Sequence, residues 1–376
     1  MPREKLLLIS RNLPPLVGGM ERLMQNTARI LSNHYSLTVI GPKGASEHLP
    51  SNIRVHELPA SPMLFILLSI PLALWLTGKN RYQIVMGGSG VMAPAIAIIQ
   101  KLRNCQGVVF VHGLDIIANN TIYQTIFVRA LRHIDKVIAN SNNTKALAVA
   151  AGIHEQKISI IHPGTNLPEI DKIKSREYLD NHYALKNKRI LLSVGRITPR
   201  KGLKQFVQNC MPSLCEQDSG ITLLIAGDHP RQGLKKSTKL PAEIATISQK
   251  LGIRNNIVFL GSVSDQALSH CYAGSDCLIF PLINIPSDVE GFGMVAIEAA
   301  AHGTPTIAFN EGGVSDAVNE AKSGALVTRG DYTQFTTVAM NYLNKTPASS
   351  SQSCKSFAKQ FSWVNFEQLL LNALHQ

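Results

Sequence analysis

The sequence Glu290-Gly291-Phe292-Gly293-Met294-Val295-Ala296-Ile297-Glu298 sets two carboxylates, separated by seven residues, around a Gly-Phe-Gly turn. The preceding run, 277–280, is typical of a buried strand, and the alanine-rich run 295–302 ends before Gly303, which predicts a helix. A turn between a strand and a helix lets backbone N–H groups approach a ligand and points a positive helix end at it, which favours a phosphate. We therefore expect Glu298, about one turn inside the helix, to reach hydroxyl groups beside that phosphate.

A second junction of this kind lies upstream. Residues 189–194 read as a buried strand and run directly into Gly195-Arg196-Ile197-Thr198-Pro199-Arg200-Lys201-Gly202. Arg196 and Lys201 bracket a proline-containing loop, so two cations can converge on one anion. Because Arg offers a two-pronged donor to phosphate oxygens and Lys a mobile charge, this loop predicts a site for a departing diphosphate.

These stretches resemble the retaining family 4 glycosyltransferases, which have the GT-B fold and use nucleotide-sugar donors. One departure is Asp316, where many members carry Glu, so one side chain is shorter here. The sequence of residues 288–293 is most similar to that of mannosyltransferase relatives. The resemblance rests on these residues, in the family's order: Gly18-Gly19 with Glu21, His112-Gly113, Gly195-Arg196 with Lys201-Gly202, Glu290 with Glu298, and Gly312-Gly313.

The resemblance implies a role for each site residue. Arg196, Lys201, Glu290 and His112 form the catalytic set, in which Glu290 holds sugar hydroxyls rather than acting as a nucleophile and His112 faces the transferred sugar. The loop around Gly18 closes over the donor diphosphate. Backbone groups near Val263 meet the nucleobase, and Glu298 holds the ribose. The residues implied in donor binding are Gly18, Gly19, Gly195, Val263, Gly291, Phe292, Gly293, Met294 and Glu298.

Taken one at a time, these residues have plainer interpretations. A glycine pair permits a turn, and a histidine at a strand end is more often structural. A retaining glycosidase would place two carboxyl groups about 5 Å apart across the bond, which a separation along the sequence does not establish. No D-x-D sequence lies near either loop. The expectation is therefore that no obligatory metal or other cofactor is needed beyond the donor.

A glycine-rich stretch at 88–93 competes with this interpretation. It satisfies the dinucleotide fingerprint G-x-G-x-x-A after the strand predicted at 83–87. That fingerprint also needs an acidic residue about twenty positions later to hold a ribose, and residues 108–112 contain none. We therefore predict a tight structural turn there.

Alternating strands and helices predict two parallel-sheet domains of the α/β class. The expected GT-B arrangement has two Rossmann-like domains that face a central cleft, with an acceptor-side domain at 1–168, a linker at 169–187 and a nucleotide-sugar domain at 188–355. The segment 356–376 is expected to return to the first domain through a helix with Trp363, Phe366, Leu369, Leu370 and Leu374 on one face. Strands are expected at 5–10, 37–41, 53–58, 83–87, 108–112, 136–140 and 158–162, and at 189–194, 221–226, 257–260, 277–280, 306–309 and 325–328.

The 376 residues carry a net charge of +12, concentrated in the first half, where 16 Lys and Arg face 7 Asp and Glu through Pro168. Such an excess attracts nucleic acid or anionic membranes, or simply aids solubility. No zinc-finger spacing or RNP-type aromatic run is present, which argues against nucleic acid. The six scattered cysteines indicate buried apolar residues. The short apolar run at the start is not a signal peptide, so a cytoplasmic location is expected, with the inner face of the membrane as one alternative.

The most apolar run is Met63–Leu76, fourteen residues with an internal proline. A membrane span needs about twenty residues, so crossing is not expected. Two alternatives remain: a buried helix of the first domain, which we favour, or a helix with its apolar face in the lipid interface.

The sequence thus predicts a retaining glycosyltransferase that moves a hexose, such as mannose, glucose or N-acetylglucosamine, to a glycan or lipid-linked acceptor in polysaccharide, lipopolysaccharide or glycolipid synthesis. One alternative is a nucleotide-sugar 2-epimerase, which uses the same fold. Another is a non-catalytic GT-B subunit that only binds a partner, although Arg196, Lys201, Glu290 and Glu298 are all intact.

Overall fold

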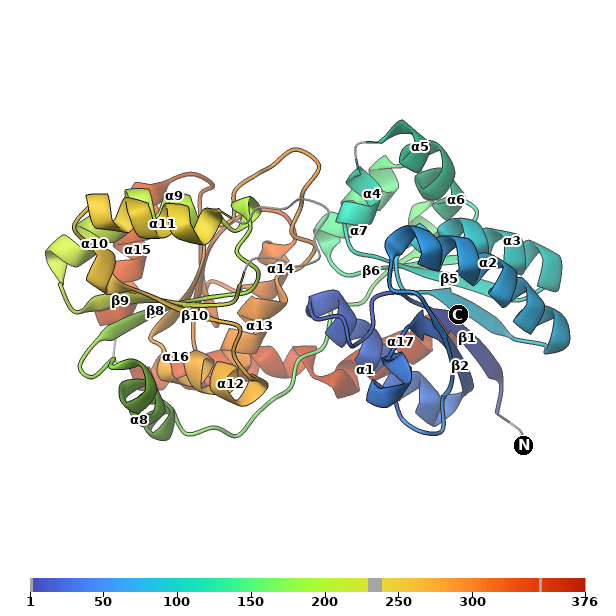
Figure 1. Ribbon diagram of the computed structural model, residues 1–376, viewed down its shortest axis with the longest axis horizontal. Coiled ribbons are helices and arrows are strands. Elements are labelled where there is room, and N and C mark those ends of the chain that lie inside the picture. Colours follow the sequence, from blue (N-terminus) through green and yellow to red (C-terminus); the bar gives the residue numbers. More distant parts are fainter. Residues whose placement is uncertain (1–2, 119, 229–238, 345–346, 376) are drawn as a thin grey trace. The chain divides into compact units, whose positions relative to one another are not determined.

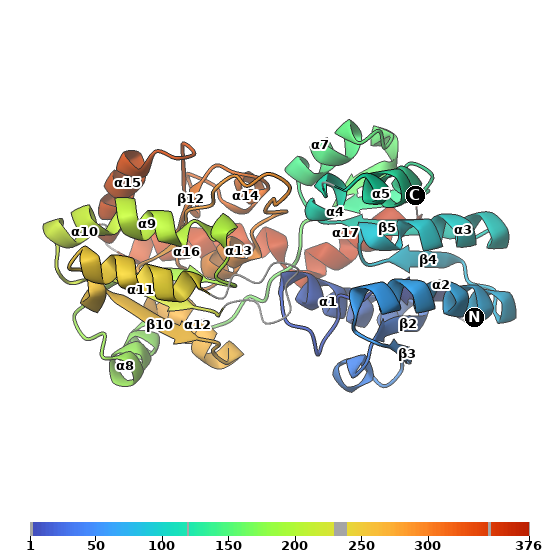
Figure 2. The ribbon, with the colours of Figure 1, turned by 45° about the horizontal axis from the view of Figure 1, so that its top comes forward.

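The computed structural model describes residues 3–118, 120–228, 239–344 and 347–375 (Figure 1). The chain divides into two compact units, Met1–Gly164 with Trp363–Gln376 (unit 1) and Thr165–Ser362 (unit 2). Each unit is a parallel sheet covered by helices (Figures 1 and 2). The predicted pair of Rossmann-like domains is confirmed.

Unit 1 contains a seven-stranded sheet in the order β3-β2-β1-β4-β5-β6-β7, with every pair parallel. The side chains of β1 alternate between two cores: Leu6 and Leu8 belong to one cluster, and Leu7 and Ile9 to the other. All four are fully buried, as expected for a parallel sheet covered on both faces. The strands are β1 (Lys5–Ile9), β2 (Ser36–Pro42), β3 (Arg54–Leu58), β4 (Ile84–Gly87), β5 (Gln106–Val111), β6 (Lys136–Ala139) and β7 (Ile158–Ile160).

The helices of unit 1 fill the connections between these strands. α1 and the C-terminal α17 contribute to the core on one face, and α2, α3 and α7 contribute to the core on the other. The helices are α1 (Gly19–His34), α2 (Pro62–Lys79), α3 (Ala93–Arg103), α4 (Leu114–Ile117), α5 (Thr121–Tyr123), the π-helical η3 (Gln124–Val128), α6 (Arg129–Leu131), α7 (Asn142–Ala150) and α17 (Trp363–His375), with short 3-10 turns at Ala45–His48, Gly90–Met92 and Glu155–Lys157.

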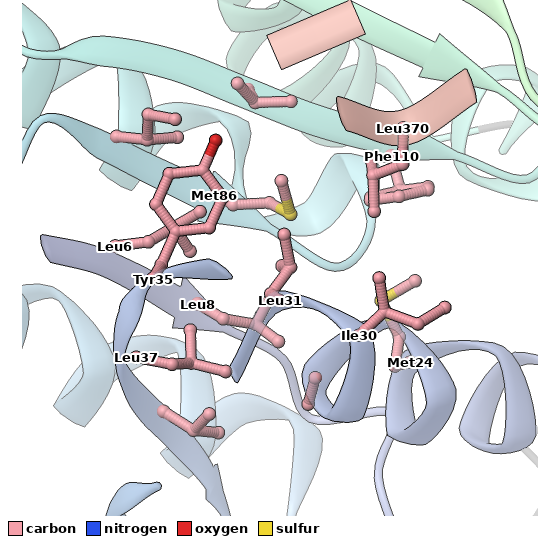
Figure 3. Packing of buried hydrophobic residues seen from close by; sticks show 14 of the residues in the cluster. Leu6, Leu8, Met24, Ile30, Leu31, Tyr35, Leu37, Met86, Phe110 and Leu370 are labelled. Carbon is pink, nitrogen blue, oxygen red and sulfur yellow. The ribbon is translucent and has the colours of Figure 1, made fainter. Parts of the chain in front are cut away.

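The predicted return of the last helix to the first unit is confirmed. Phe366, Leu370 and Leu374 of α17 are buried in the same cluster as Leu31 of α1. Figure 3 shows Leu370 beside Phe110 of β5. Leu369, predicted to lie on the same face, is instead exposed, because the buried positions follow a spacing of three and four residues that omits it.

Leu370→Ala is expected to lower the free energy of unfolding of unit 1 by about 3 kcal/mol, because it leaves a cavity in a fully packed core. The matched control is Leu369→Ala on the exposed side of the same helix, which should change stability by less than about 0.5 kcal/mol. Chemical denaturation followed by circular dichroism measures both. Equal effects would show that α17 does not complete the core.

Unit 2 contains a six-stranded parallel sheet in the order β10-β9-β8-β11-β12-β13. The strands are β8 (Arg189–Val194), β9 (Ile221–Ala226), β10 (Ile257–Gly261), β11 (Cys277–Phe280), β12 (Thr306–Phe309) and β13 (Gly324–Val327). The helices are α8 (Lys172–Tyr183), the 3-10 turn η5 (Pro199–Lys201), α9 (Leu203–Asn209), α10 (Met211–Gln217), α11 (Leu240–Lys250), the 3-10 turn at Arg254–Asn256, α12 (Asp265–Gly274), α13 (Met294–Ala301), α14 (Val314–Ala317), α15 (Tyr332–Asn344), α16 (Pro347–Ala358) and the 3-10 turn at Lys359–Phe361. All thirteen predicted strands are present, with ends that differ by at most two residues.

The division of the chain differs from the expected linker at 169–187. That segment is polar, but it forms α8, which packs against α12 with Leu179 buried in the core of unit 2. An ion pair of 2.9 Å between Arg176 and Asp276 fixes α8 to the sheet. The returning segment also begins later than predicted, at Trp363, since α16 belongs to unit 2.

The helix α2 is longer and less buried than the sequence predicted. It spans 18 residues and continues through Pro71. Phe65, Ala73 and Leu76 are buried in unit 1, but much of the remaining surface of the helix is exposed. By length and composition it is the one helix in the described part of the chain that could cross a membrane, a test that core helices of soluble proteins also pass. Burial is thus confirmed for one face only.

Candidate active site

Most of the predicted site residues lie in loops at the carboxyl ends of the central strands. Strand order reverses between β1 and β4 in unit 1 and between β8 and β11 in unit 2. At such a point the connections leave in opposite directions, and open α/β sheets bind their ligands there. The loop that holds Gly18 follows β1, the loop that holds Lys201 follows β8, and Glu290 follows β11.

Two cations and two carboxylates form a cluster in unit 2. Lys201 Nζ donates to Glu290 Oε2 at 2.9 Å, and a terminal nitrogen of Arg200 binds the same oxygen. Arg200 Nε lies 2.9 Å from Asp288 Oδ1. The side chains of Arg200 and Lys201 are 15% exposed and that of Glu290 is 17% exposed, so the cluster is largely withdrawn from water.

A glycine brings this cluster together. Gly202 has φ +67°, and a Cβ atom there would lie 1.8 Å from the carbonyl oxygen of Pro281. The backbone N–H of Ile283 also donates to the carbonyl of Arg200 at 2.9 Å. The turn η5 therefore packs directly on the loop after β11, which carries Glu290. Lys201 Nζ also lies 4.4 Å from the centre of the Phe280 ring, a cation–π distance.

The electrostatics of the cluster keep Glu290 ionised. Burial alone would raise the pKa of Glu290, but the charges of Lys201 and Arg200 outweigh it and lower the pKa to about 2. Burial lowers the pKa of Lys201, and the charge of Glu290 opposes that shift. A carboxylate with so low a pKa is a weak base and a weak nucleophile at neutral pH. The position of Glu290 favours holding cations or hydroxyl groups.

Arg196 differs from the sequence prediction, which paired it with Lys201. Its side chain is exposed, and within the described ranges no carboxylate forms an ion pair with it. Its charge contributes to the lowered pKa of Lys201. The cation that shares Glu290 with Lys201 is Arg200. The sequence prediction did not include Arg200 or Asp288. Two features of the sequence could have indicated them: Arg200 is adjacent to Lys201, and Asp288 lies two residues before Glu290.

The turn before α13 has the predicted form. Gly293 has φ +97°, and α13 begins at the next residue. The pair Gly312 and Gly313 packs behind Glu290: the N–H of Gly313 donates to the Glu290 carbonyl at 2.9 Å, and a Cβ on Gly312 would lie 2.6 Å from that oxygen. These contacts fix the backbone of Glu290 while its side chain faces Lys201.

Glu298 and Val263 lie on neighbouring elements of unit 2. Glu298 is in α13, and the buried Tyr272 of α12 donates its hydroxyl to Glu298 Oε2 at 2.8 Å. Val263 follows β10 and packs on the cluster that contains Tyr272. The sequence did not identify Tyr272, because a tyrosine in an amphipathic helix gives no signal of a partner on another helix.

His112 of unit 1 is buried at the end of β5, parallel to the ring of Phe110. Its Nε2 lies 2.9 Å from the Gly88 carbonyl, so Nε2 carries the proton and Nδ1 is left as an acceptor. In the described part of the chain, Nδ1 is buried without a hydrogen-bond partner. Both oxygens of Asp115 are used at 2.8 Å, by the N–H groups of His112 and Gly90. The ring is therefore fixed with one unused acceptor.

The glycine-rich stretches of unit 1 are close-packed. The N–H of Gly88 donates to the Ile9 carbonyl, and a Cβ on Gly88 would lie 2.3 Å from Ser10 Oγ. A Cβ on Gly18 would lie 2.4 Å from a carboxylate oxygen of Glu21. The stretch 88–93 thus has a packing role in the turn after β4. This agrees with the prediction of a structural turn, which was based on the lack of an acidic residue at 108–112.

No group of three or more metal-ligating side chains (His, Cys, Asp or Glu) is found in residues 3–118, 120–228, 239–344 and 347–375. All six cysteines are free thiols, and four of them are buried. Burial raises the pKa of Cys271 to about 12, which makes this thiol unreactive. The cysteines are packing residues.

Two family models match the chain. The model of the glycosyl transferases group 1 matches residues 175–361, and that of Glycosyltransferase Family 4 matches residues 17–169. The two matches follow the two units of the structure closely.

Curated relatives share sequence with part of the chain. The D-inositol 3-phosphate glycosyltransferase of Mycolicibacterium smegmatis is 30% identical over 239 residues, which cover 63% of this chain and 52% of the relative. The protein of the same name from Gordonia bronchialis is 28% identical over 247 residues, covering 64% of this chain and 52% of that protein. The matched segments thus span about half the length of these relatives.

Solved structures share the fold along the whole chain. HepE from Anabaena, in complex with UDP and glucose, has a TM-score of 0.80 at 20% identity and is matched over 99% of this chain and 100% of its own. The sucrose-phosphate synthase of Thermosynechococcus elongatus has a TM-score of 0.81 at 20% identity, over 100% of this chain and 99% of its own. At these identities the likeness establishes the fold.

Proposed function

This chain belongs to the GT-B glycosyltransferases, and on that premise we propose that it moves a hexose from a nucleoside-diphosphate sugar to a glycan or lipid-linked acceptor, with retention at the anomeric carbon. The observation that carries the proposal is the buried Lys201, held by Glu290 between Arg200 and the exposed Arg196. The loop carries three cations against the two carboxylates of Asp288 and Glu290, which leaves a net positive charge for an anionic ligand.

The charges account for the chemistry. Breaking the bond between sugar and phosphate places negative charge on the departing diphosphate, and fixed cations beside it are the strongest means of stabilising the transition state. Lys201 and Arg196 would take the phosphate oxygens, with the backbone amides of Gly291–Met294 at the start of α13. Because these side chains supply the positive charge, we propose that no metal ion is obligatory.

The role proposed for Glu290 is electrostatic. Its pKa of about 2 makes it a poor nucleophile, which supports a front-face reaction in which the leaving phosphate oxygen accepts the proton of the acceptor hydroxyl. In that reaction the acceptor oxygen bonds to the anomeric carbon on the face from which the diphosphate leaves. Glu290 would orient Lys201 and hold hydroxyls of the transferred sugar.

The remaining site residues would bind the donor. We propose that Glu298 holds the ribose and that backbone groups near Val263 meet the base. The unused Nδ1 acceptor of His112 suits a hydroxyl of the transferred hexose. Gly18 and Gly19 would let the loop after β1 approach the phosphates. UDP and glucose are present in the HepE complex, which makes UDP-sugars the first donors to test. GDP-mannose is the next, because residues 288–293 resemble those of mannosyltransferases.

Tyr272→Phe is expected to raise the donor KM about tenfold with little change in kcat, because it removes one hydrogen bond that orients the Glu298 carboxylate proposed to hold the ribose. The matched control is Tyr342→Phe, which removes a hydroxyl bonded at 2.8 Å to the Gly324 carbonyl in the same unit. Steady-state kinetics with varied donor compare the two. A similar KM in both variants would contradict the proposed role of Tyr272 in orienting Glu298.

The proposed function is tested by incubating the protein with a panel of UDP- and GDP-sugars and scoring release of nucleoside diphosphate, with and without membrane extract. Release that depends on one donor and on the extract is expected. The anomeric configuration of the product, read by NMR, tests retention. Formation of an epimer from UDP-N-acetylglucosamine alone would identify a 2-epimerase instead, and no release with any donor would favour a non-catalytic subunit.

We also propose a cytoplasmic location at the inner face of the membrane, where a lipid-linked acceptor would be met. The support is the basic excess of the first half of the chain together with the exposed surface of α2. Fractionation of cells is the direct measurement. Recovery of the protein outside the cytoplasmic and membrane fractions would contradict this location.

A further inference from the structure

The helix α2 carries an apolar surface that the described residues of unit 1 leave uncovered. Met63 is 72% exposed, Leu67 is 59% exposed and Trp75 is 51% exposed. Leu64 and Leu68 are exposed on the same helix. Exposed large apolar side chains that gather on one element mark an interaction site.

The apolar surface continues onto neighbouring elements. α3 packs against α2 and exposes Ile98 and Leu102, and Figures 1 and 2 both show these helices side by side. On the other side, an apolar cleft of about 100 Å³ separates Ile66 and Ile70 of α2 from Ile126 and Phe127 of η3. We call the exposed residues Met63, Leu64, Leu67, Leu68, Trp75, Ile98, Leu102 and Ile126 the apolar face of unit 1.

Cations border this face. Lys79, Arg81 and Arg103 line a cavity of about 340 Å³ where α2 and α3 end. Lys79 Nζ also lies 4.1 Å from the centre of the Trp75 ring, so the apolar and charged groups meet. Cations in the last turn of a helix partly balance its dipole, but Arg81 lies outside both helices and adds to the surplus.

The segment that forms this surface contains no acidic residue of its own. The sequence contains no Asp or Glu from residue 58 to residue 114. Asp115, the next one, uses both carboxylate oxygens to bind backbone N–H groups. From outside this range, the charge of Asp135 reaches Cys105, which lines the same cavity as the three cations. The surface formed by α2, α3 and their connections therefore combines large apolar side chains with an excess of positive charge, which is the composition of segments that lie on anionic lipid.

We propose that the apolar face of unit 1 docks on an anionic phospholipid bilayer, with the side chains of α2 in the lipid interface and Lys79, Arg81 and Arg103 on the headgroup phosphates. The inference deepens the proposed function, since it names the surface at which a lipid-linked acceptor would be met. Phe65, Ala73 and Leu76 are buried in the core of unit 1, so lipid cannot surround α2 and the helix lies on the membrane.

Charge complementarity decides between a lipid surface and a second copy of the chain. A symmetric pair formed through this face would bring two sets of cations together without an acidic partner in residues 58–114. Phospholipid headgroups supply the missing negative charge.

The test is sedimentation of the full chain with phosphatidylcholine vesicles that contain or lack phosphatidylglycerol, at low and high salt and without donor or acceptor. The protein is expected to pellet with the anionic vesicles at low salt. Leu67→Glu combined with Leu68→Glu should weaken binding by about tenfold or more. Lys79→Gln combined with Arg81→Gln should weaken it by roughly tenfold or more and reduce the salt dependence.

The matched control is Ile173→Glu, at an exposed apolar position of unit 2, which should bind vesicles like the unaltered chain. Because no sugar substrate is present, the assay tests vesicle binding alone. A negative result would therefore not contradict the proposed transfer reaction. The proposal is overturned if the protein does not pellet, if the Leu67 and Leu68 variant pellets equally, or if alkaline carbonate fails to release the protein from membranes. It is also overturned if sedimentation velocity shows a dimer that the same variant dissociates.

Discussion

Replacing Lys201 with Met is expected to lower kcat at saturating donor by about a hundredfold to a thousandfold, the effect of removing one preorganised charge from a leaving group. The Lys201 ammonium is buried beside Glu290, and the departing diphosphate would lose its closest cation. The long apolar side chain of Met keeps the contact with the Phe280 ring. Loss of activity would then follow from loss of charge.

The control for this variant is Lys204→Met. Lys204 pairs with Glu243 at 2.9 Å, but both side chains are more than a third exposed, so little stability and no activity should be lost. Thermal denaturation of both variants checks that the fold survives. A Lys201→Met enzyme that turns over at the normal rate would contradict the proposed role of Lys201.

Glu290→Gln is expected to abolish most transfer and to destabilise unit 2. The substitution leaves Lys201 without its carboxylate partner and Arg200 with Asp288 alone, and breaking a buried ion pair from one side is costly. The shift of the Glu290 pKa from 4.5 to about 2 corresponds to about 3 kcal/mol of folding free energy at neutral pH. Chemical denaturation at pH 7 measures the loss.

The same shift predicts a pH dependence. Because folding lowers the pKa of Glu290, its stabilising contribution is complete above pH 4.5 and is lost as the pH falls toward 2. The unaltered protein should therefore lose stability across this window more steeply than Glu290→Gln. The control Glu243→Gln, in the exposed pair with Lys204, should leave the slope unchanged. Equal slopes for the unaltered protein and Glu290→Gln would show that Glu290 is not held by these cations.

Most strands could be predicted from sequence because they are short runs of β-branched and apolar residues, buried on both faces and bounded by turn residues. The edge strand β3 is an exception, because its five residues are exposed or half-buried. Glu290 and Lys201 could be predicted because each lies in a glycine-containing loop that directly follows a recognisable buried strand, in the order found in family 4 glycosyltransferases. Arg200 and Asp288 could not, because their pairing depends on the close contact between Gly202 and the carbonyl of Pro281. A backbone contact of this kind leaves no periodic pattern.

Two segments show where polarity along the chain misleads. Residues 172–183 have the composition of a linker, yet Leu179 and the ion pair of Arg176 suffice to fix α8 on unit 2. The run at 63–76 has the composition of a core helix, yet the sheet covers one side of α2 only. In both cases the neighbours of the helix decide burial, and these come from distant parts of the sequence.

The most direct test of the central claim is a crystal structure of the protein with UDP or GDP bound. The account predicts that oxygens of the terminal phosphate lie about 3 Å from Lys201 Nζ and from the Arg196 guanidinium. A nucleotide bound away from the loop 195–202, with Lys201 still held only by Glu290, would contradict it.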